Sequence, residues 1–126
     1  MRAGSFKPVL GWPLLCCLFV PGGAAVGAVY SFLDQTPMRY FTAEDSRLMS
    51  ENIDAVLANP ADNVSLGWRN DKTSSNGEAV SLRSFEHQGM SCRRLRIDNH
   101  ANGADARTTA DLCDVDGIWK VLRLPK

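Results

Sequence analysis

A long uncharged stretch near the start of the chain limits what the rest can fold into. Arg2 and Lys7 give the chain a positive start, and no charged residue then appears across residues 8–33. Pro21 and the glycines after it interrupt this stretch, so its strongly apolar part covers only residues 8–20. A segment of that length is typical of a signal-peptide core and is short for a membrane span. Such a leader leaves about 100 residues, which is enough for one domain.

Small residues follow the apolar segment, as a signal peptidase requires, and we expect cleavage after Ala28 or Ala25. The alternative is an uncleaved anchor, because the spacing of Gly23 and Gly27 lets membrane helices approach closely. We therefore divide the chain into a signal peptide or uncleaved N-terminal anchor at 1–28, a linker at 29–41 and a domain at 42–126. Both forms predict an exported protein, and an anchor would associate with the membrane through residues 8–33.

Two cysteines lie outside the leader, Cys92 and Cys113. In an oxidising compartment, two cysteines in a small domain have only one pairing. A bridge between them would close a loop of about 20 residues and stabilise the domain by about 3 kcal/mol. Zinc is not expected, because two distant cysteines with only His87 and His100 nearby do not have the spacing of a zinc site. We therefore predict a structural disulfide, no metal and no cofactor.

A helix is predicted directly after residue 42. Thr42 has the character of an N-cap, and Asp45 stands where a capping box places its acidic residue. Apolar residues then recur at a spacing of about 3.6 and form one stripe. The stripe consists of Leu48, Met49, Ile53, Val56 and Leu57. The helix should end near Ala58, since Asn59 precedes Pro60 and the residue before a proline disfavours helical geometry.

Beyond Pro60 the apolar residues alternate. Val64, Leu66 and Trp68 predict a half-buried strand with these three side chains facing the core. Further strands are expected at 78–87, 90–98, 104–114 and 118–124. They are joined by a loop over 69–77 that ends in an Asn76-Gly77 turn, and by turns at Gln88-Gly89, 99–103 and Asp116-Gly117.

Within the second predicted strand, Val80 and Leu82 should face the core, and Phe85 falls out of phase, which indicates a bulge. Short strands with hairpin-length connections favour antiparallel pairing. The sequence therefore predicts an α+β fold, with one N-terminal helix packed on an antiparallel sheet of about five strands.

The charge of the chain argues against a nucleic-acid partner. The sequence has 14 Lys and Arg against 14 Asp and Glu, and two of the basic residues, Arg2 and Lys7, belong to the leader. A nucleic-acid-binding domain would instead carry an excess of basic residues.

Three arginines lie close together in the third predicted strand. Alternation places Arg94 and Arg96 on one face and Arg93 on the other, with Leu95 and Ile97. Arg94 and Arg96 are candidates for contact with an anionic ligand, because paired guanidinium groups suit carboxylate and phosphate. The alternative is a solvated sheet face, on which arginines pair with acidic residues of neighbouring strands.

No catalytic arrangement is evident in the sequence. Neither a Gly-x-Ser-x-Gly elbow nor a His-x-x-x-His helix occurs. Cys92 is the strongest candidate nucleophile, but in an oxidising compartment we expect it to pair with Cys113. We therefore expect a protein that is not an enzyme and has no catalytic residues.

Five short segments occur in a fixed order along the chain. They are Tyr-Phe-Thr-Ala-Glu-Asp at 40–45, Leu-Gly-Trp-Arg-Asn at 66–70, Asn-Gly at 76–77, Ser-Cys-Arg at 91–93 and Cys-Asp-Val-Asp-Gly-Ile-Trp at 113–119. Together they resemble the C-terminal domain of the bacterial 17-kilodalton surface-antigen family, and the resemblance spans residues 40–121. Members of that family look like outer-membrane or periplasmic lipoproteins with a glycine-zipper segment before this domain. Here only Gly22-Gly23 and Gly27 correspond to that segment.

The resemblance implies an address in the cell envelope, either the periplasm or the outer membrane and cell surface. On that basis we expect a non-catalytic, surface-antigen-like module that binds or scaffolds envelope components. Its partner would be an envelope protein, lipid or polymer. The alternative is a small secreted periplasmic inhibitor or binding protein that acts on a soluble partner.

Overall fold

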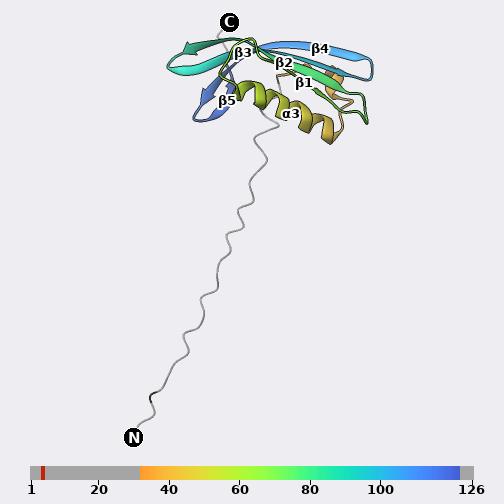
Figure 1. Cartoon of the computed structure of the whole chain (residues 1–126), viewed down its shortest axis with the longest axis horizontal. Helices are drawn as coiled ribbons and strands as arrows, with labels where there is room; N and C mark the ends of the chain where they lie inside the picture. The colour runs from red at the N-terminus through yellow and green to blue at the C-terminus, as the bar shows by residue number, and fades with distance from the viewer. Residues whose placement is uncertain (1–3, 5–31, 123–126) are drawn as a thin grey trace.

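The computed structural model describes Gly4 and residues 32–122. Along the chain it contains α2 (Gln35–Met38), α3 (Ala43–Ala58), β1 (Ser65–Arg69), β2 (Asn76–His87), β3 (Met90–Ala101), β4 (Ala104–Val115) and β5 (Ile118–Val121). The strands form one antiparallel sheet in the order β1-β2-β3-β4-β5. α3 lies across one face of this sheet (Figure 1). The predicted α+β fold is therefore confirmed.

The predicted leader at 1–28 and its cleavage sites lie outside the described residues, apart from Gly4. Within the described part of the chain, no helix is long and apolar enough to cross a membrane. The segment expected as a linker, 29–41, contains α2, and its Leu33 and Pro37 are buried. Packing against the sheet thus begins before Thr42.

Both ends of α3 agree with the sequence prediction. The Thr42 side chain accepts a hydrogen bond from the Asp45 amide at 3.2 Å, and the Asp45 carboxylate accepts one from the Thr42 amide at 2.8 Å. This capping box satisfies two amide groups that the first turn leaves without helical partners. At the other end Asn59 is extended, one residue before Pro60.

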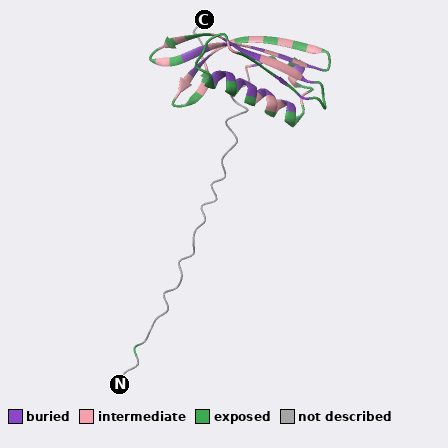
Figure 2. Cartoon of the chain, in the orientation of Figure 1, coloured by how far each residue is buried: buried purple, intermediate pink, exposed green. Residues whose placement is uncertain are grey.

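The hydrophobic core lies between α3 and the sheet. The buried apolar residues of α3 are Met49, Ile53, Val56 and Leu57. They pack with Leu33 and with the buried strand residues Trp68, Ala79, Leu95, Ile97 and Leu112. Figure 2 shows this buried layer in purple between the helix and the strands. The face of the sheet away from α3 is open. Charged residues of β2, β3 and β4 alternate there with the core positions, and the buried Val80, Cys92 and Cys113 lie on the same face.

The sequence predicted the wrong core residues at one edge of the sheet. Leu66 remains 37% exposed, because β1 is an edge strand with no neighbour on its outer side. In β2 the residues on the core side are Ala79 and Ser81, whereas Val80, although buried, pairs with Arg96 on the open face. The register shift lies between Ser81 and Arg83, so the expected bulge occurs earlier than Phe85.

The predicted turn at Asn76-Gly77 is also wrong. These two residues belong to β2 and pair with Arg69 and Trp68 of β1. The connection is instead the loop of residues 70–75, closed by a hydrogen bond from the Asn70 amide to the Ser75 carbonyl at 2.9 Å. An Asn-Gly pair favours a turn only where no partner strand competes for its backbone.

The other three hairpin turns follow their local sequence. Gln88-Gly89, Asn102-Gly103 and Asp116-Gly117 each have both residues at positive φ. This geometry matches the twist of antiparallel strands, and glycine adopts it without steric cost. The third predicted turn, at 99–103, is therefore shorter than expected, and β3 continues to Ala101.

Gly77 is needed because Trp68 lies across it. A Cβ atom at position 77 would come within 2.5 Å of both the Trp68 indole nitrogen and the Asp98 carbonyl oxygen. We expect Gly77→Ala to lower the free energy of unfolding by about 1–3 kcal/mol through overpacking. Gly67→Ala is the matched control on β1, where the nearest atom would be 3.5 Å away. Equal urea midpoints for the two variants would contradict this account.

The structure contains the predicted Cys92–Cys113 disulfide, with a Cα–Cα distance of 4.0 Å. A turn centred at Ala101, in the middle of the predicted 99–103 turn, would place the two cysteines slightly out of alignment, so that a bulge or pairing through another strand would be needed. They are in fact directly opposite in β3 and β4, and this pair of strands has no register shift. The offset disappears because the hairpin turn is at Asn102-Gly103 and not centred at Ala101.

Candidate functional site

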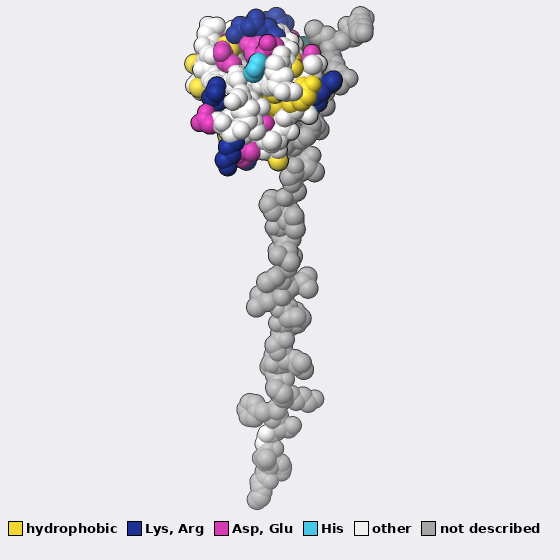
Figure 3. All heavy atoms as spheres, turned by 90° about the vertical axis from the view of Figure 1, so that its right-hand side faces the viewer, with side chains coloured by type: hydrophobic (Ala, Val, Ile, Leu, Met, Phe, Trp, Pro, Cys, Tyr) yellow, Lys and Arg dark blue, Asp and Glu magenta, His cyan; other side chains and the backbone are white. Residues whose placement is uncertain are grey.

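The open face of the sheet carries most of the polar chemistry of the domain. We call it the charged face and define it by ten side chains that share this side of β2, β3 and β4. They are Asn76, Glu78, Arg83, Arg94, Arg96, Asp98, His100, Asp105, Arg107 and Asp111. In the view of Figure 3, acidic and basic side chains lie close together on the surface of the molecule.

Two acidic side chains of neighbouring strands lie opposite each other on the charged face, and arginines neutralise their charge. Glu78 faces Asp98 across β2 and β3, but Arg107 of β4 forms a bidentate pair with Asp98 at 2.7 and 3.3 Å. Arg96 lies between the two acids, 3.7 Å from Glu78 and 3.4 Å from Asp98. Asp98 raises the pKa of Arg107 by accepting its hydrogen bonds. The acids of this region are thus held in place by two arginines.

Arg94 is paired in the same way further along the sheet. Its guanidinium donates two hydrogen bonds to Asp111, at 2.8 and 3.0 Å, from the neighbouring strand. These bonds hold the pKa of Asp111 below its usual range and raise the pKa of Arg94. Arg83 lies opposite Arg94 and stacks over the Phe85 ring, with 4.6 Å between the guanidinium carbon and the ring centre.

Arg94 and Arg96 therefore share the open face, and each faces acidic partners across the strands. This is the arrangement expected for a solvated sheet face with paired charges. Contact of Arg94 and Arg96 with an anionic ligand stays a prediction, and such a ligand would have to compete with Asp111 for the Arg94 guanidinium.

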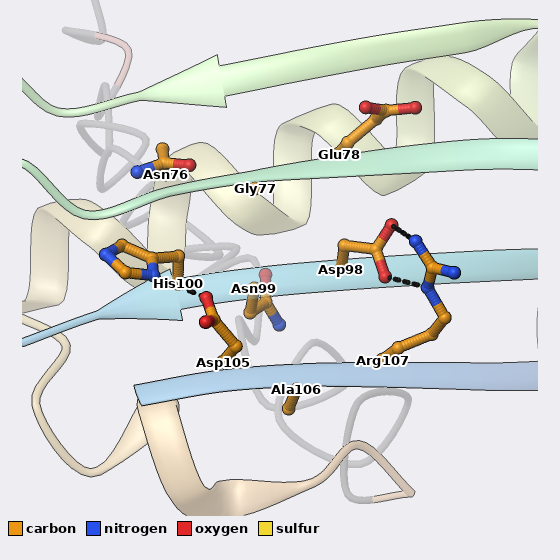
Figure 4. A pocket seen from close by; sticks show the side chains of 9 residues that line it. All are labelled: Asn76, Gly77, Glu78, Asp98, Asn99, His100, Asp105, Ala106 and Arg107. Carbon is orange, nitrogen blue, oxygen red and sulfur yellow. Dashed lines mark hydrogen bonds and ion pairs between the residues drawn. The ribbon is translucent and has the colours of Figure 1, made fainter. Parts of the chain in front are cut away.

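The charged face has a hollow of ≈ 430 Å³ that is lined by residues of β2, β3 and β4. Figure 4 shows Asn76 and Glu78 from β2, Asp98 and His100 from β3, and Asp105 and Arg107 from β4 around it. His100 Nδ1 is 2.5 Å from an Asp105 carboxylate oxygen. No group of three or more metal-ligating side chains has the geometry for an ion among the described residues.

The two strand tryptophans differ in exposure. Trp68 is a core residue, and its ring meets the Phe41 ring edge-on with 5.3 Å between centres. Trp119 is half-buried and lines a second hollow of ≈ 520 Å³ with Leu57, Pro60 and Arg93. Phe85 and Cys92 also line this hollow.

The sequence assigned no role to Arg93, which is only 5% exposed. Its guanidinium donates hydrogen bonds to the carbonyls of Val56 at 3.0 Å and Leu57 at 3.3 Å, and also to those of Asn59 and Ala61. The last carbonyls of a helix have no helical partners, so Arg93 caps the C-terminus of α3. The available signal was an arginine at a core-facing strand position, beside Leu95.

A second buried polar group holds the N-terminus of α3. The Asp45 carboxylate is 0% exposed, and besides capping the helix it accepts hydrogen bonds from Asn70 and Thr73, both at 2.7 Å. Burial by itself would raise its pKa, but the bonds from Thr42, Thr73 and Asn70 outweigh burial and hold the pKa of Asp45 below its usual range. These bonds join the β1–β2 loop to the helix.

The lowered pKa of Asp45 predicts a pH dependence of stability. Its contribution is complete above the unfolded pKa of about 4 and is lost as the pH falls through the lower folded pKa. We expect Asp45→Asn to be destabilising at pH 7 and to differ less from the parent at pH 3, in urea midpoints. Asp71→Asn, at a carboxylate whose side chain is 92% exposed, is the control. A deficit of Asp45→Asn that is the same at both pH values would contradict this role.

Comparison with known proteins adds no relative: no family model, no curated protein and no solved structure matches this chain.

Proposed function

We propose that this protein is a non-catalytic module of the cell envelope that binds another envelope component through the charged face. The supporting observation is that ion pairs fix the positions of the side chains on that face. Arg94, Arg96 and Arg107 are each held by carboxylates on their own or neighbouring strands. Fixed charges of both signs lose little side-chain freedom on binding and select a partner with the complementary pattern.

The mixed charge favours a protein partner over a uniformly anionic lipid or polymer. Arg94 and Arg96 would attract an anionic surface, but Glu78, Asp98 and Asp111 lie on the same face and would oppose it. A protein surface can present both signs in one arrangement. The resemblance to surface antigens supports the envelope as the place of this contact.

Site-specific photo-crosslinking in the expressing host tests the proposal. A photoreactive residue at Thr109, exposed on the charged face, is expected to link the chain to a discrete protein of the membrane fraction. The same group at Glu51, on the solvent side of α3, is the matched control. Arg96→Glu should abolish the Thr109 product.

Two results would contradict the proposal. Identical products from positions 109 and 51 would mean that the charged face has no special role. A Thr109 product found only in the soluble fraction would favour the secreted inhibitor or binding protein.

A further inference from the structure

Among the described residues, the outer edge of β4 is largely unpaired. β5 pairs with residues 112–115 of β4, so within the part of the chain that the structure describes, residues 104–110 have a neighbouring strand on one side alone. Within the described part of the chain, no main-chain or side-chain group hydrogen-bonds the backbone on the outer side of residues 104–110. An edge strand of this kind is a template for pairing with another strand.

The pattern of the sheet defines which backbone groups point outward. Beyond β5, the Leu122 amide donates to the Asp111 carbonyl at 2.7 Å, so the Asp111 carbonyl points to the outer side of β4. Backbone direction alternates along a strand. Asp105, Arg107 and Thr109 therefore also present their N–H and C=O groups to the outer side, and their side chains lie on the charged face.

We propose that this edge pairs with the same edge of a second copy of the chain, in one antiparallel register. In that register Asp105 lies opposite the partner subunit's Arg107, and Arg107 opposite the partner subunit's Asp105. Each of these pairs exchanges two backbone hydrogen bonds, and Ala106 lies on the two-fold axis.

Charge selects this register over its neighbours. Moving one strand by two residues in one direction places Arg107 opposite the partner's Arg107, and in the other direction Asp105 opposite the partner's Asp105. A further shift places Asp105 opposite the partner's Asp111. Like charges directly opposite each other are unfavourable in a sheet. The Asp105 and Arg107 side chains are 78% and 65% exposed, and to reach across the edge they would exchange their present partners, His100 and Asp98, for each other.

The strand lacks several features that usually prevent edge pairing, although α2 contacts β4 and the Asp34 amide donates to the Thr108 hydroxyl at 3.4 Å. β4 contains neither proline nor lysine and has no register shift against β3. On its core side the edge residues are small, namely Ala104, Ala106 and Thr108. Pairing would join the two five-stranded sheets into one and place the two charged faces side by side. The inference goes beyond the proposed function and does not depend on it.

Cysteine crosslinking of the full chain tests the register. Ala106 and the partner's Ala106 would form a non-hydrogen-bonded pair, whose Cβ atoms lie about 5 Å apart. We therefore expect Ala106→Cys, oxidised with diamide, to run at twice the monomer mass on a non-reducing gel. In Ala104→Cys the two new sulfurs would be about 13 Å apart along the strands, so no such band is expected. The parent chain, oxidised in the same way, is the control for dimers linked through Cys16 or Cys17.

Charge exchange tests the partner contact in the Ala106→Cys background. Arg107→Asp should remove the covalent dimer, and Asp105→Arg combined with Arg107→Asp should restore it. Arg69→Asp, on the opposite edge strand β1, should leave it unchanged. Thermal midpoints of all variants report whether the fold is retained.

Three results would overturn the proposal. The first is equal crosslinking at positions 104 and 106, or none at either. The second is a dimer band that survives Arg107→Asp. The third is a parent chain that sediments as a monomer at every concentration. If the amides at 105, 107 and 109 of that monomer also resist hydrogen exchange, another part of the same chain covers the edge.

Discussion

Replacing Cys92 and Cys113 together with alanine is expected to lower the free energy of unfolding by about 2–5 kcal/mol. The bridge joins residues separated by 21 positions, and its loss would release that loop in the unfolded chain. In the folded chain it links β3 to β4 near the end of the hairpin that is far from the Asn102-Gly103 turn. Both cysteines are buried, so the alanines would also leave a small cavity.

Urea denaturation of the oxidised parent and of the double variant measures this loss. The parent reduced with dithiothreitol is the control, because it lacks the bond but keeps both sulfur atoms. Its midpoint should lie close to that of the double variant. A parent whose midpoint does not respond to reduction would contradict a structural role for the bridge, as would reactive thiols at both positions in the denatured, unreduced protein.

Arg93→Ala is expected to cost about 3–5 kcal/mol, because it would leave the carbonyls of Leu57 and Asn59 without a donor and take one of two donors from those of Val56 and Ala61. A buried acceptor that loses its partner costs about 1–3 kcal/mol. Val56 and Leu57 are both buried residues whose carbonyls accept from Arg93. The lost arginine stem would remove packing as well.

Two further variants separate these contributions. Arg93→Met keeps the length of the side chain without its donors, and we expect it to retain only part of the stability. Arg94→Ala changes the adjacent arginine on the charged face and should have a much smaller effect, because exposed ion pairs contribute little. Urea midpoints that rank Arg94→Ala with Arg93→Ala, or Arg93→Met with the parent, would rule out the capping role.

The helix and most of the turns could be predicted because their signals are local. The Thr42–Asp45 capping box, the proline after Asn59 and the Xaa-Gly pairs of three hairpins each act within a few residues. Alternation likewise placed Arg93 and Arg94 on opposite faces of β3. The pairing of Cys92 with Cys113 followed once Cys16 and Cys17 were assigned to the predicted leader.

Less of the candidate site could be predicted from the sequence. Alternation placed Arg94 and Arg96 together, but it could not show that Asp111 already occupies the Arg94 guanidinium. It also could not show that, among the described residues, β5 pairs with residues 112–115 of β4 and not with Asp105 and Arg107. Strand register and strand length decide both.

Sequence by itself determined the class of the fold, the limits of α3 and the residues of the disulfide. Tertiary structure decided that Asn76-Gly77 continues a strand, that Ala79 and Ser81 face the core and that Arg93 caps the helix. Two of these depend on a partner on another element, namely Trp68 of β1 for Gly77 and the end of α3 for Arg93. Local propensities contribute about 1 kcal/mol or less per residue. Burying the Trp68 ring or satisfying the carbonyls at the end of α3 contributes more and therefore decides the structure.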